Sequence, residues 1–179
     1  MEYDVVIVGA GPAGLTTAIK LKQLDPNLNV CILEKGSEVG AHILSGNVFE
    51  TKALDELIPN WKNEGAPVKT KVSKEKFLFL GKNSSLSWPT WLLPAVQKNH
   101  NNYIVSLANL CRWLAEQAEK LGVEIFPGFP ASEVLYNEDG SVKGVATLDM
   151  GLDKEGNKKD GYQEGMAVSY THLTLPTKA

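Results

Sequence analysis

A glycine pattern near the start of the sequence strongly restricts how this chain can fold. The β-branched run Val5–Val8 is followed by Gly9, Gly11 and Gly14, spaced as G-x-G-x-x-G. Such a run is typical of a strand buried on both faces. The glycines have separate tasks in this arrangement: a tight turn, a close approach of backbone to a pyrophosphate, and contact between helix and strand. The spacing predicts a strand, a phosphate-binding loop and a helix.

The next twenty residues complete a β-α-β unit. An apolar helical pattern covers Leu15–Leu24, a strand pattern covers Asn29–Leu33, and Glu34 ends that strand. The helix offers unpaired N–H groups and its positive dipole end to a pyrophosphate, and we expect Pro12 and Ala13 to line this loop. Glu34 stands where a carboxylate can accept both hydroxyls of an adenosine ribose. A glycine-rich turn without a ligand is the alternative, and the elements in register favour a dinucleotide site.

The segment after Glu34 is also rich in glycine. It reads KGSEVGAHILSG from Lys35 to Gly46, and small residues allow a backbone to lie close to a flat or bulky ligand. Its position after a dinucleotide-binding unit favours a cofactor loop over an ordinary surface loop with an exposed histidine. If the dinucleotide is FAD, this loop passes the ribityl chain and the isoalloxazine ring. We include Lys35 among the candidate cofactor contacts.

Composition narrows the functional classes. The 179 residues suffice for one domain with a sizeable core, and a net charge of -3 gives no electrostatic reason to expect a nucleic-acid partner. Cys31 and Cys111 each lie in an apolar pattern, so we expect buried free thiols rather than a disulfide or metal ligands. No apolar run reaches eighteen residues, and Met1 stands two residues before the first strand. We therefore expect neither a membrane span nor a leader peptide.

The character of the sequence changes after residue 62. Strand patterns over Lys76–Leu80 and Leu86–Trp88 predict a small inserted sheet. The stretch Trp88–Val96 reads WPTWLLPAV, and its two prolines exclude a regular helix or a central strand. Irregular apolar chain of this kind is either packed beneath the protein or deliberately exposed. Lys82 and Lys98 flank it, as suits a segment at lipid headgroups, but we adopt burial as the default.

The rest of the chain returns to regular elements. A continuous apolar stripe predicts a helix from Leu107 to Leu121, whose face packs in the core. Further elements are expected as a short helix at Thr51–Ile58, strands at Asn102–Val105 and Val123–Phe126, a hairpin of Ala131–Tyr136 with Val142–Asp149, and a solvated turn at Asp153–Asp160. This order predicts an α/β fold: a three-layer FAD-binding domain, Rossmann-like and of the glutathione-reductase type, with a β-meander and a partial inserted sheet.

Four stretches of the chain resemble the electron transfer flavoprotein–ubiquinone oxidoreductase family. They are VVIVGAGPAGL, VGAHILSG, NYIVSLANLCRWLAEQAEKLGVEIFPGF and ASEVLYNEDGSVKGVATLDMG, within a resemblance that runs from Asp4 to Met166. The resemblance implies a phosphate loop at Gly9, Gly11 and Gly14 and a ribose acid at Glu34. It implies a loop beside the flavin formed by Gly40, Ala41, His42, Ser45 and Gly46.

The resemblance also implies an activity and a location. Members of this family move electrons from reduced electron transfer flavoprotein, through FAD and a [4Fe–4S] cluster, to ubiquinone. We expect a protein peripheral on the cytoplasmic side of a bacterial inner membrane, with residues 1–62 as FAD-binding unit and flavin loop, 63–101 as quinone and membrane-side insert, and 102–167 as the return to the FAD domain. The cluster cysteines would lie in a region absent from this chain, so we assign no metal ligand.

Two alternatives remain open on the sequence. One is another FAD-dependent reductase or monooxygenase of the same superfamily, such as a geranylgeranyl-reductase-like protein. The other is a cofactor-binding fragment without activity. Electron transfer needs no acid–base triad, and we assign no catalytic residue.

The last twelve residues depart from the family pattern. A closing strand of the flavin site should begin near Ala167, and we find no pattern for it. Instead, Val168–Thr177 reads VSYTHLTLPT, which resembles one reading frame of a transposase-end adapter used in DNA sequencing. We interpret 168–179 as translated adapter and the chain as a truncated gene product. Alternation of Tyr170, His172 and Thr174 permits a natural strand as the alternative.

Overall fold

The computed structural model describes residues 1–152 and 157–174. The chain divides into two compact units, which we call unit 1 (residues 1–43 and 108–179) and unit 2 (residues 44–107). Unit 2 therefore contains the predicted insert together with the last part of the predicted flavin loop. Within the described residues, none of the helices combines the length and the apolar character needed to cross a bilayer.

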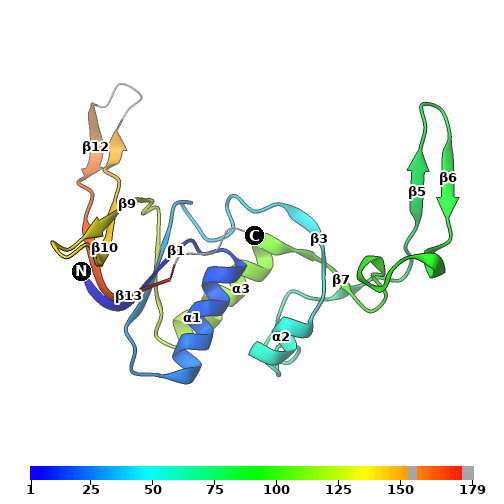
Figure 1. Cartoon of the computed structure of the whole chain (residues 1–179), viewed down its shortest axis with the longest axis horizontal. Coiled ribbons are helices and arrows are strands. Elements are labelled where there is room, and N and C mark those ends of the chain that lie inside the picture. The colour runs from blue at the N-terminus through cyan, green and yellow to red at the C-terminus, as the bar shows by residue number, and fades with distance from the viewer. Residues whose placement is uncertain (153–156, 175–179) are drawn as a thin grey trace. The chain divides into compact units, whose positions relative to one another are not determined.

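Unit 1 is built on a six-stranded sheet of order β8-β2-β1-β13-β10-β9 (Figure 1). Its strands are β1 (Glu2–Val8), β2 (Val30–Glu34), β8 (Glu124–Pro127), β9 (Ala131–Tyr136), β10 (Val142–Thr147) and β13 (Ala167–Thr174). The strands β8, β2, β1 and β13 are parallel to one another, whereas β10 runs antiparallel to both β13 and β9. The predicted fold class is confirmed, with both meander strands β9 and β10 joined to the parallel sheet.

Two helices and a small hairpin accompany this sheet. They are α1 (Pro12–Leu24), which packs against β1 and β2, α3 (Leu107–Lys120), and the pair β11 (Met150–Leu152) with β12 (Lys158–Gln163). The apolar stripe of α3 is buried from Leu110 to Ala118 as predicted. Leu121 lies beyond the helix and is 39% exposed, because Gly122 at φ +85° ends the helix there.

Cys31 on β2 and Cys111 on α3 are both buried, as the sequence predicts. Val6, Cys31, Leu33, Val145 and Val168 form one buried cluster. Burial raises the pKa of the Cys31 thiol to about 12, so the thiol stays neutral and packs as a small apolar group. Cys31 and Cys111 are both free thiols.

Unit 2 carries the inserted sheet that the sequence predicts and a second sheet that it does not. The hairpin of β5 (Phe77–Leu80) and β6 (Ser85–Trp88) is present (Figure 1). The second sheet has the order β3-β7-β4, with β3 (Ser45–Phe49), β7 (Tyr103–Ser106) and β4 (Thr70–Lys71). A short helix α2 (Lys52–Leu57) and two 3-10 turns, η1 (Thr90–Leu92) and η2 (Ala95–Gln97), complete the unit.

The default of burial for Trp88–Val96 is wrong. Trp91 is 74% exposed and Val96 is 94% exposed, while Leu93 at 8% is the buried exception. Pro89 and Pro94 each precede a single 3-10 turn, and turns of three residues cannot direct all of their side chains to one packed face. The irregular conformation was predicted correctly, and its exposure was not.

The expectation that no closing strand begins near Ala167 is wrong, whereas the adapter origin of residues 168–179 stays a prediction. β13 begins at Ala167 and lies between β1 and β10. Val168 is buried in the core, and the backbone N–H of Ser169 donates to the carbonyl of Met1 at 3.0 Å. Backbone pairing depends little on side-chain identity, so alternating residues of any origin can occupy this position. Residues 175–179 of the proposed adapter tail lie outside the described residues.

The predicted turn at Asp153–Asp160 is partly replaced by strand. β12 starts at Lys158 and pairs with β11. Residues 153–156 of the predicted turn lie outside the described residues. Charged residues are compatible with a strand here because all residues of β12 except the half-buried Tyr162 are exposed.

We expect Gly144→Ala to test whether β13 forms. A Cβ at Gly144 would collide with the carbonyl of Val168 on β13, so the substitution should lower the free energy of unfolding by about 1–3 kcal/mol. Lys143→Ala, an exposed neighbour on the same strand, is the control and should change it by less than about 0.5 kcal/mol. Equal urea denaturation midpoints for both variants would mean that β13 does not pair with β10.

Candidate dinucleotide-binding site

The turn that follows β1 brings the glycine loop next to the end of β2. Gly9 adopts φ +99°, a conformation that L side chains rarely adopt. Its backbone N–H donates to the carbonyl of Leu33 at 2.7 Å. The first glycine of the pattern therefore makes the tight turn that the spacing predicted.

The second and third glycines differ in what surrounds them. Gly11 is the N-cap residue of α1, with Pro12 following, and no side chain caps the helix there. A Cβ at Gly11 would meet no atom within 4 Å, whereas a Cβ at Gly14 would collide with the carbonyl of Gly9. Gly14 is thus required for contact of helix and loop. The space at Gly11 stays open toward the helix amino terminus, where an anion is favoured.

Glu34 joins the glycine loop to the loop after β2. One oxygen, Oε2, accepts the backbone N–H of Ala10 at 2.8 Å, and Oε1 accepts the backbone N–H of Gly36 at 2.7 Å. A carboxylate has about four acceptor positions, so two remain for further donors. This geometry suits the predicted ribose contact and adds a second task, which is to hold the two loops together.

The loop after β2 remains close to this carboxylate. A Cβ at Gly36 would lie 3.1 Å from Oε1 of Glu34 and 3.3 Å from Nδ1 of His42, so His42 borders the same region. Gly40, at φ +86°, lies against the backbone of Ala108 on α3. Lys35, Ala41 and His42 are exposed, and Gly40 is buried.

The structure brings most predicted site residues together in unit 1. They are Gly9, Gly11, Pro12, Ala13, Gly14, Glu34, Lys35, Gly40, Ala41 and His42. Ser45 and Gly46 belong to unit 2, where they begin β3 and pair with β7. The sequence did not indicate that strand.

Two participants were missed by reasoning from the sequence. Ala10 and Gly36 act through backbone N–H groups, which no side-chain pattern reveals. For Gly36, the sequence offered one signal, which is a glycine two residues after Glu34. On α3, burial raises the pKa of the Cys111 thiol to about 11, and the charge of Glu34 adds to the shift. Cys111 therefore lies near the site as an un-ionised thiol.

Comparison with known proteins extends these observations. A model of the Thi4 family matches residues 1–57. The chain is 56% identical to the mitochondrial electron transfer flavoprotein-ubiquinone oxidoreductase of Oryza sativa, over 94% of this chain and 29% of that protein. It is also 56% identical to the electron transfer flavoprotein-ubiquinone oxidoreductase of Pseudomonas aeruginosa, over 90% of this chain and 30% of that protein.

The chain is a homologue of electron transfer flavoprotein-ubiquinone oxidoreductases. The resemblance seen in the sequence is thereby confirmed, and the chain spans about 29% of the length of the Oryza relative. Among solved structures, a geranylgeranyl bacteriochlorophyll reductase-like protein from Thermoplasma acidophilum matches with a TM-score of 0.65 at 21% identity, over 97% of this chain and 38% of that one. Likeness at that identity concerns the fold alone.

We expect Glu34→Ala to destabilise this oxidoreductase homologue even without a ligand. The substitution leaves the N–H groups of Ala10 and Gly36 without their charged acceptor, which should lower the free energy of unfolding by about 1.5–3 kcal/mol. Glu38→Ala is the control, since its exposed ion pair with Arg112 is worth at most about 1 kcal/mol. If chemical denaturation gives equal losses for both, Glu34 does not hold the loops together.

Proposed function

We propose that this chain is the FAD-binding part of an oxidoreductase that passes electrons from reduced electron transfer flavoprotein to ubiquinone. The observation that carries this proposal is the open space at Gly11 beside the uncapped start of α1, with Glu34 held at the adjacent strand end. The identity to electron transfer flavoprotein-ubiquinone oxidoreductases supports the choice of reaction. The likeness to a reductase-like structure does not favour a second activity, because it reflects the fold.

The residues of unit 1 fit FAD by the chemistry of their donors and acceptors. The backbone at Gly11, Pro12 and Ala13 would receive the pyrophosphate, since it lies at the positive end of α1. The free acceptor positions of Glu34 would take the ribose hydroxyls. The loop Gly40–His42 is proposed to lie along the flavin, and Ser45 and Gly46 stay predicted flavin contacts. When bound, FAD supplies the redox chemistry, and the protein supplies binding and orientation.

The proposed route from reduced electron transfer flavoprotein to ubiquinone includes a [4Fe–4S] cluster in the intact protein. Such a cluster needs four thiolate ligands. This chain has two cysteines, and both are buried thiols whose pKa values burial raises to about 12 and about 11. We therefore propose that the ligands lie outside this chain.

Unit 2 is proposed as the side that meets the membrane and the quinone. The pairing Phe77 with Trp88 and Phe79 with Leu86 places four apolar side chains on one face of the β5–β6 hairpin. All four are exposed. Neighbouring rings contact edge to face, with 5.4 Å between the centroids of Phe77 and Phe79 and 6.0 Å between Phe79 and Trp88. An exposed aromatic face of this kind suits a membrane interface.

The segment beyond the hairpin extends this apolar surface. Trp91, Leu92 and Val96 are also exposed. Because η1 and η2 are single turns, the segment would form a shallow anchor. We therefore propose peripheral membrane association, and the cytoplasmic face of a bacterial inner membrane remains the predicted location.

We expect Gly11→Val to weaken FAD binding at least tenfold without unfolding the chain. A Cβ at Gly11 meets no atom within 4 Å, but the valine side chain would occupy the volume that the pyrophosphate needs. Titration with FAD should show at least a tenfold loss of affinity, about 1.4 kcal/mol, while the thermal midpoint stays unchanged. Unaltered FAD affinity in this folded variant would refute the assigned pyrophosphate position.

We expect Trp91→Ser combined with Leu92→Ser to weaken vesicle binding. Removing two exposed apolar side chains should cost about 2 kcal/mol of partition free energy, measured by co-sedimentation with liposomes. The matched control is Leu24→Ser with Tyr136→Ser, an exposed pair in unit 1, which should leave binding unchanged. FAD content should be equal in all three proteins. A loss of FAD or of folding in the Trp91 variant would instead indicate a buried, structural segment.

A further inference from the structure

The insert segment, residues 63–101, has a charge opposite to that of the rest of the chain. It contains six lysines and two glutamates, which leaves twelve of the 18 basic side chains and 19 of the 21 acidic ones elsewhere. The insert segment is therefore positive by four charges, and the remainder is negative by seven. Proteins whose charge is divided in this way between segments present a basic surface to an anionic partner despite an acidic total.

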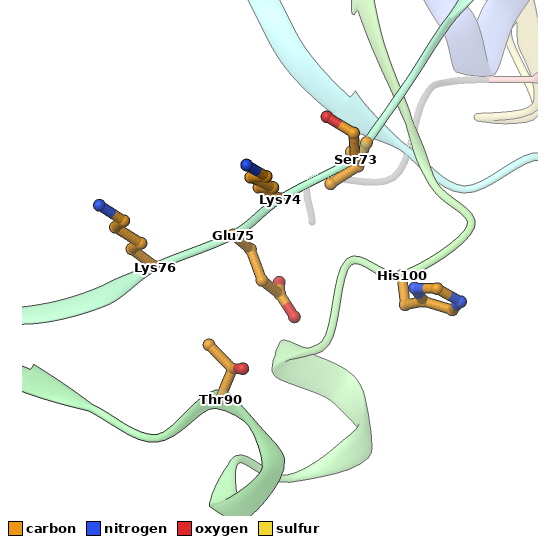
Figure 2. Close-up of a pocket in the computed structure, with 7 residues that line it drawn as sticks. Ser73, Lys74, Glu75, Lys76, Thr90 and His100 are labelled. Carbon is orange, nitrogen blue, oxygen red and sulfur yellow. The ribbon is translucent and has the colours of Figure 1, made fainter.

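Two of these lysines, Lys74 and Lys76, lie directly before the β5–β6 hairpin. A pocket at this position is lined by residues 72–76 together with Thr90 and His100 (Figure 2). Figure 2 shows Lys74 and Lys76 extending to one side of the chain while Glu75 points to the other. The two ammonium groups therefore add their charge on one side, directly before β5.

The intervening acid is already hydrogen-bonded within unit 2. Oε2 of Glu75 accepts the backbone N–H of Asn99 at 3.0 Å and its side-chain Nδ2 at 3.2 Å. These bonds hold the carboxylate toward the chain that follows η2. Glu75 is thus a poor counter-ion for Lys74 and Lys76, whose charge remains available to an external anion.

Further lysines lie at the other limits of the apolar surface. Lys82 is in the turn between β5 and β6, six residues after Lys76 and at the far end of β5. Lys98 donates from Nζ to the carbonyl of Trp91 at 3.2 Å, so its ammonium lies beside the exposed tryptophan. Basic side chains consequently border the apolar surface at the start of the hairpin, at its turn and next to η1.

We propose that the insert segment docks selectively on bilayers that contain anionic phospholipids. The inference rests on the proposed membrane association and adds the lipid class. Exposed aromatic and aliphatic side chains enter the interface, while lysine stems extend so that the ammonium groups reach the phosphate layer. Near an anionic surface, each lysine strengthens partition about fivefold, roughly 1 kcal/mol.

An acidic protein surface is the competing occupant. The observations favour a bilayer because the lysines border exposed Trp88, Trp91 and Leu92, whereas a basic patch that steers a soluble partner needs no aromatic anchor beside it. Binding of electron transfer flavoprotein is therefore included as a separate measurement in the test.

The test measures partition of the full chain to two kinds of vesicle: phosphatidylcholine alone, and phosphatidylcholine mixed with phosphatidylglycerol. The variant is Lys74→Gln with Lys76→Gln. The control, Lys20→Gln with Lys143→Gln, removes the same charge from exposed positions in unit 1. We expect the variant to bind the anionic vesicles about twenty-five-fold more weakly, the product of two fivefold factors, and the neutral vesicles with unchanged affinity. The control should change less than twofold on either, within the scatter of surface substitutions.

Salt provides a second measurement that needs no variant. Raising NaCl from about 0.1 M to 1 M shortens the Debye length from about 10 Å to 3 Å. Binding of the unaltered chain to anionic vesicles should then fall to its value on neutral ones.

The outcomes separate this inference from the proposed function. Equal, salt-independent binding of the unaltered chain to both vesicles would overturn lipid selectivity and leave membrane docking intact. Binding to neither vesicle would remove membrane docking itself, and the inference with it. If the variant and its control lose equal affinity for anionic vesicles, the net charge of the whole chain determines binding. The lysines of the insert segment then have no specific role, and the inference is wrong. If the variant binds electron transfer flavoprotein more weakly but both vesicles normally, the lysines serve the protein partner and the inference is wrong.

Discussion

Two hydrogen bonds to one carboxylate hold together the loops that follow the first two strands of this oxidoreductase homologue. Glu34 accepts from Ala10 and from Gly36, and the N–H of Gly9 reaches the end of β2 at Leu33. The loop geometry is therefore fixed before any ligand arrives. A site ordered in advance loses less conformational freedom on binding, which favours affinity without further contacts. The same side chain would then serve the fold and the nucleotide together.

The β1-α1-β2 part of the fold could be predicted from the sequence because its signals are local. The apolar run Val5–Val8 is typical of a strand buried on both faces, and Val5, Val6 and Ile7 are buried. Gly9 adopts a positive φ that glycine tolerates. The stripe along α3 has helical spacing and is buried at five successive stripe positions, Leu110, Cys111, Leu114, Ala115 and Ala118. In these segments, propensity, periodicity and tertiary burial agree, so a short window of sequence is sufficient.

The missed features depend on partners that are distant in the sequence. β3 has a weak strand pattern and exists by pairing with β7, more than fifty residues later. β13 forms by pairing with β1 and β10, and its own residues carry only a weak strand pattern. Exposure of Trp91 and Val96 could not be read from their apolar character, since the same composition suits a core or an interface. At the candidate site, the backbone donors of Ala10 and Gly36 have no side-chain signature.

The central position of β1 has a consequence for how the chain folds during synthesis. One neighbour of β1 is β13, and the terminal ammonium of Met1, directly before β1, donates to the carbonyl of Ala167, 166 positions away. Its other neighbour, β2, follows after one helix. At ribosomal rates, β1 waits roughly ten to thirty seconds for β13. Throughout that interval an edge of Val and Ile residues is open to pairing with other nascent chains. Because β1 pairs with a strand so distant in the sequence, unit 1 cannot complete its sheet early in synthesis. The first strand to be made is therefore the one that most needs protection by chaperones.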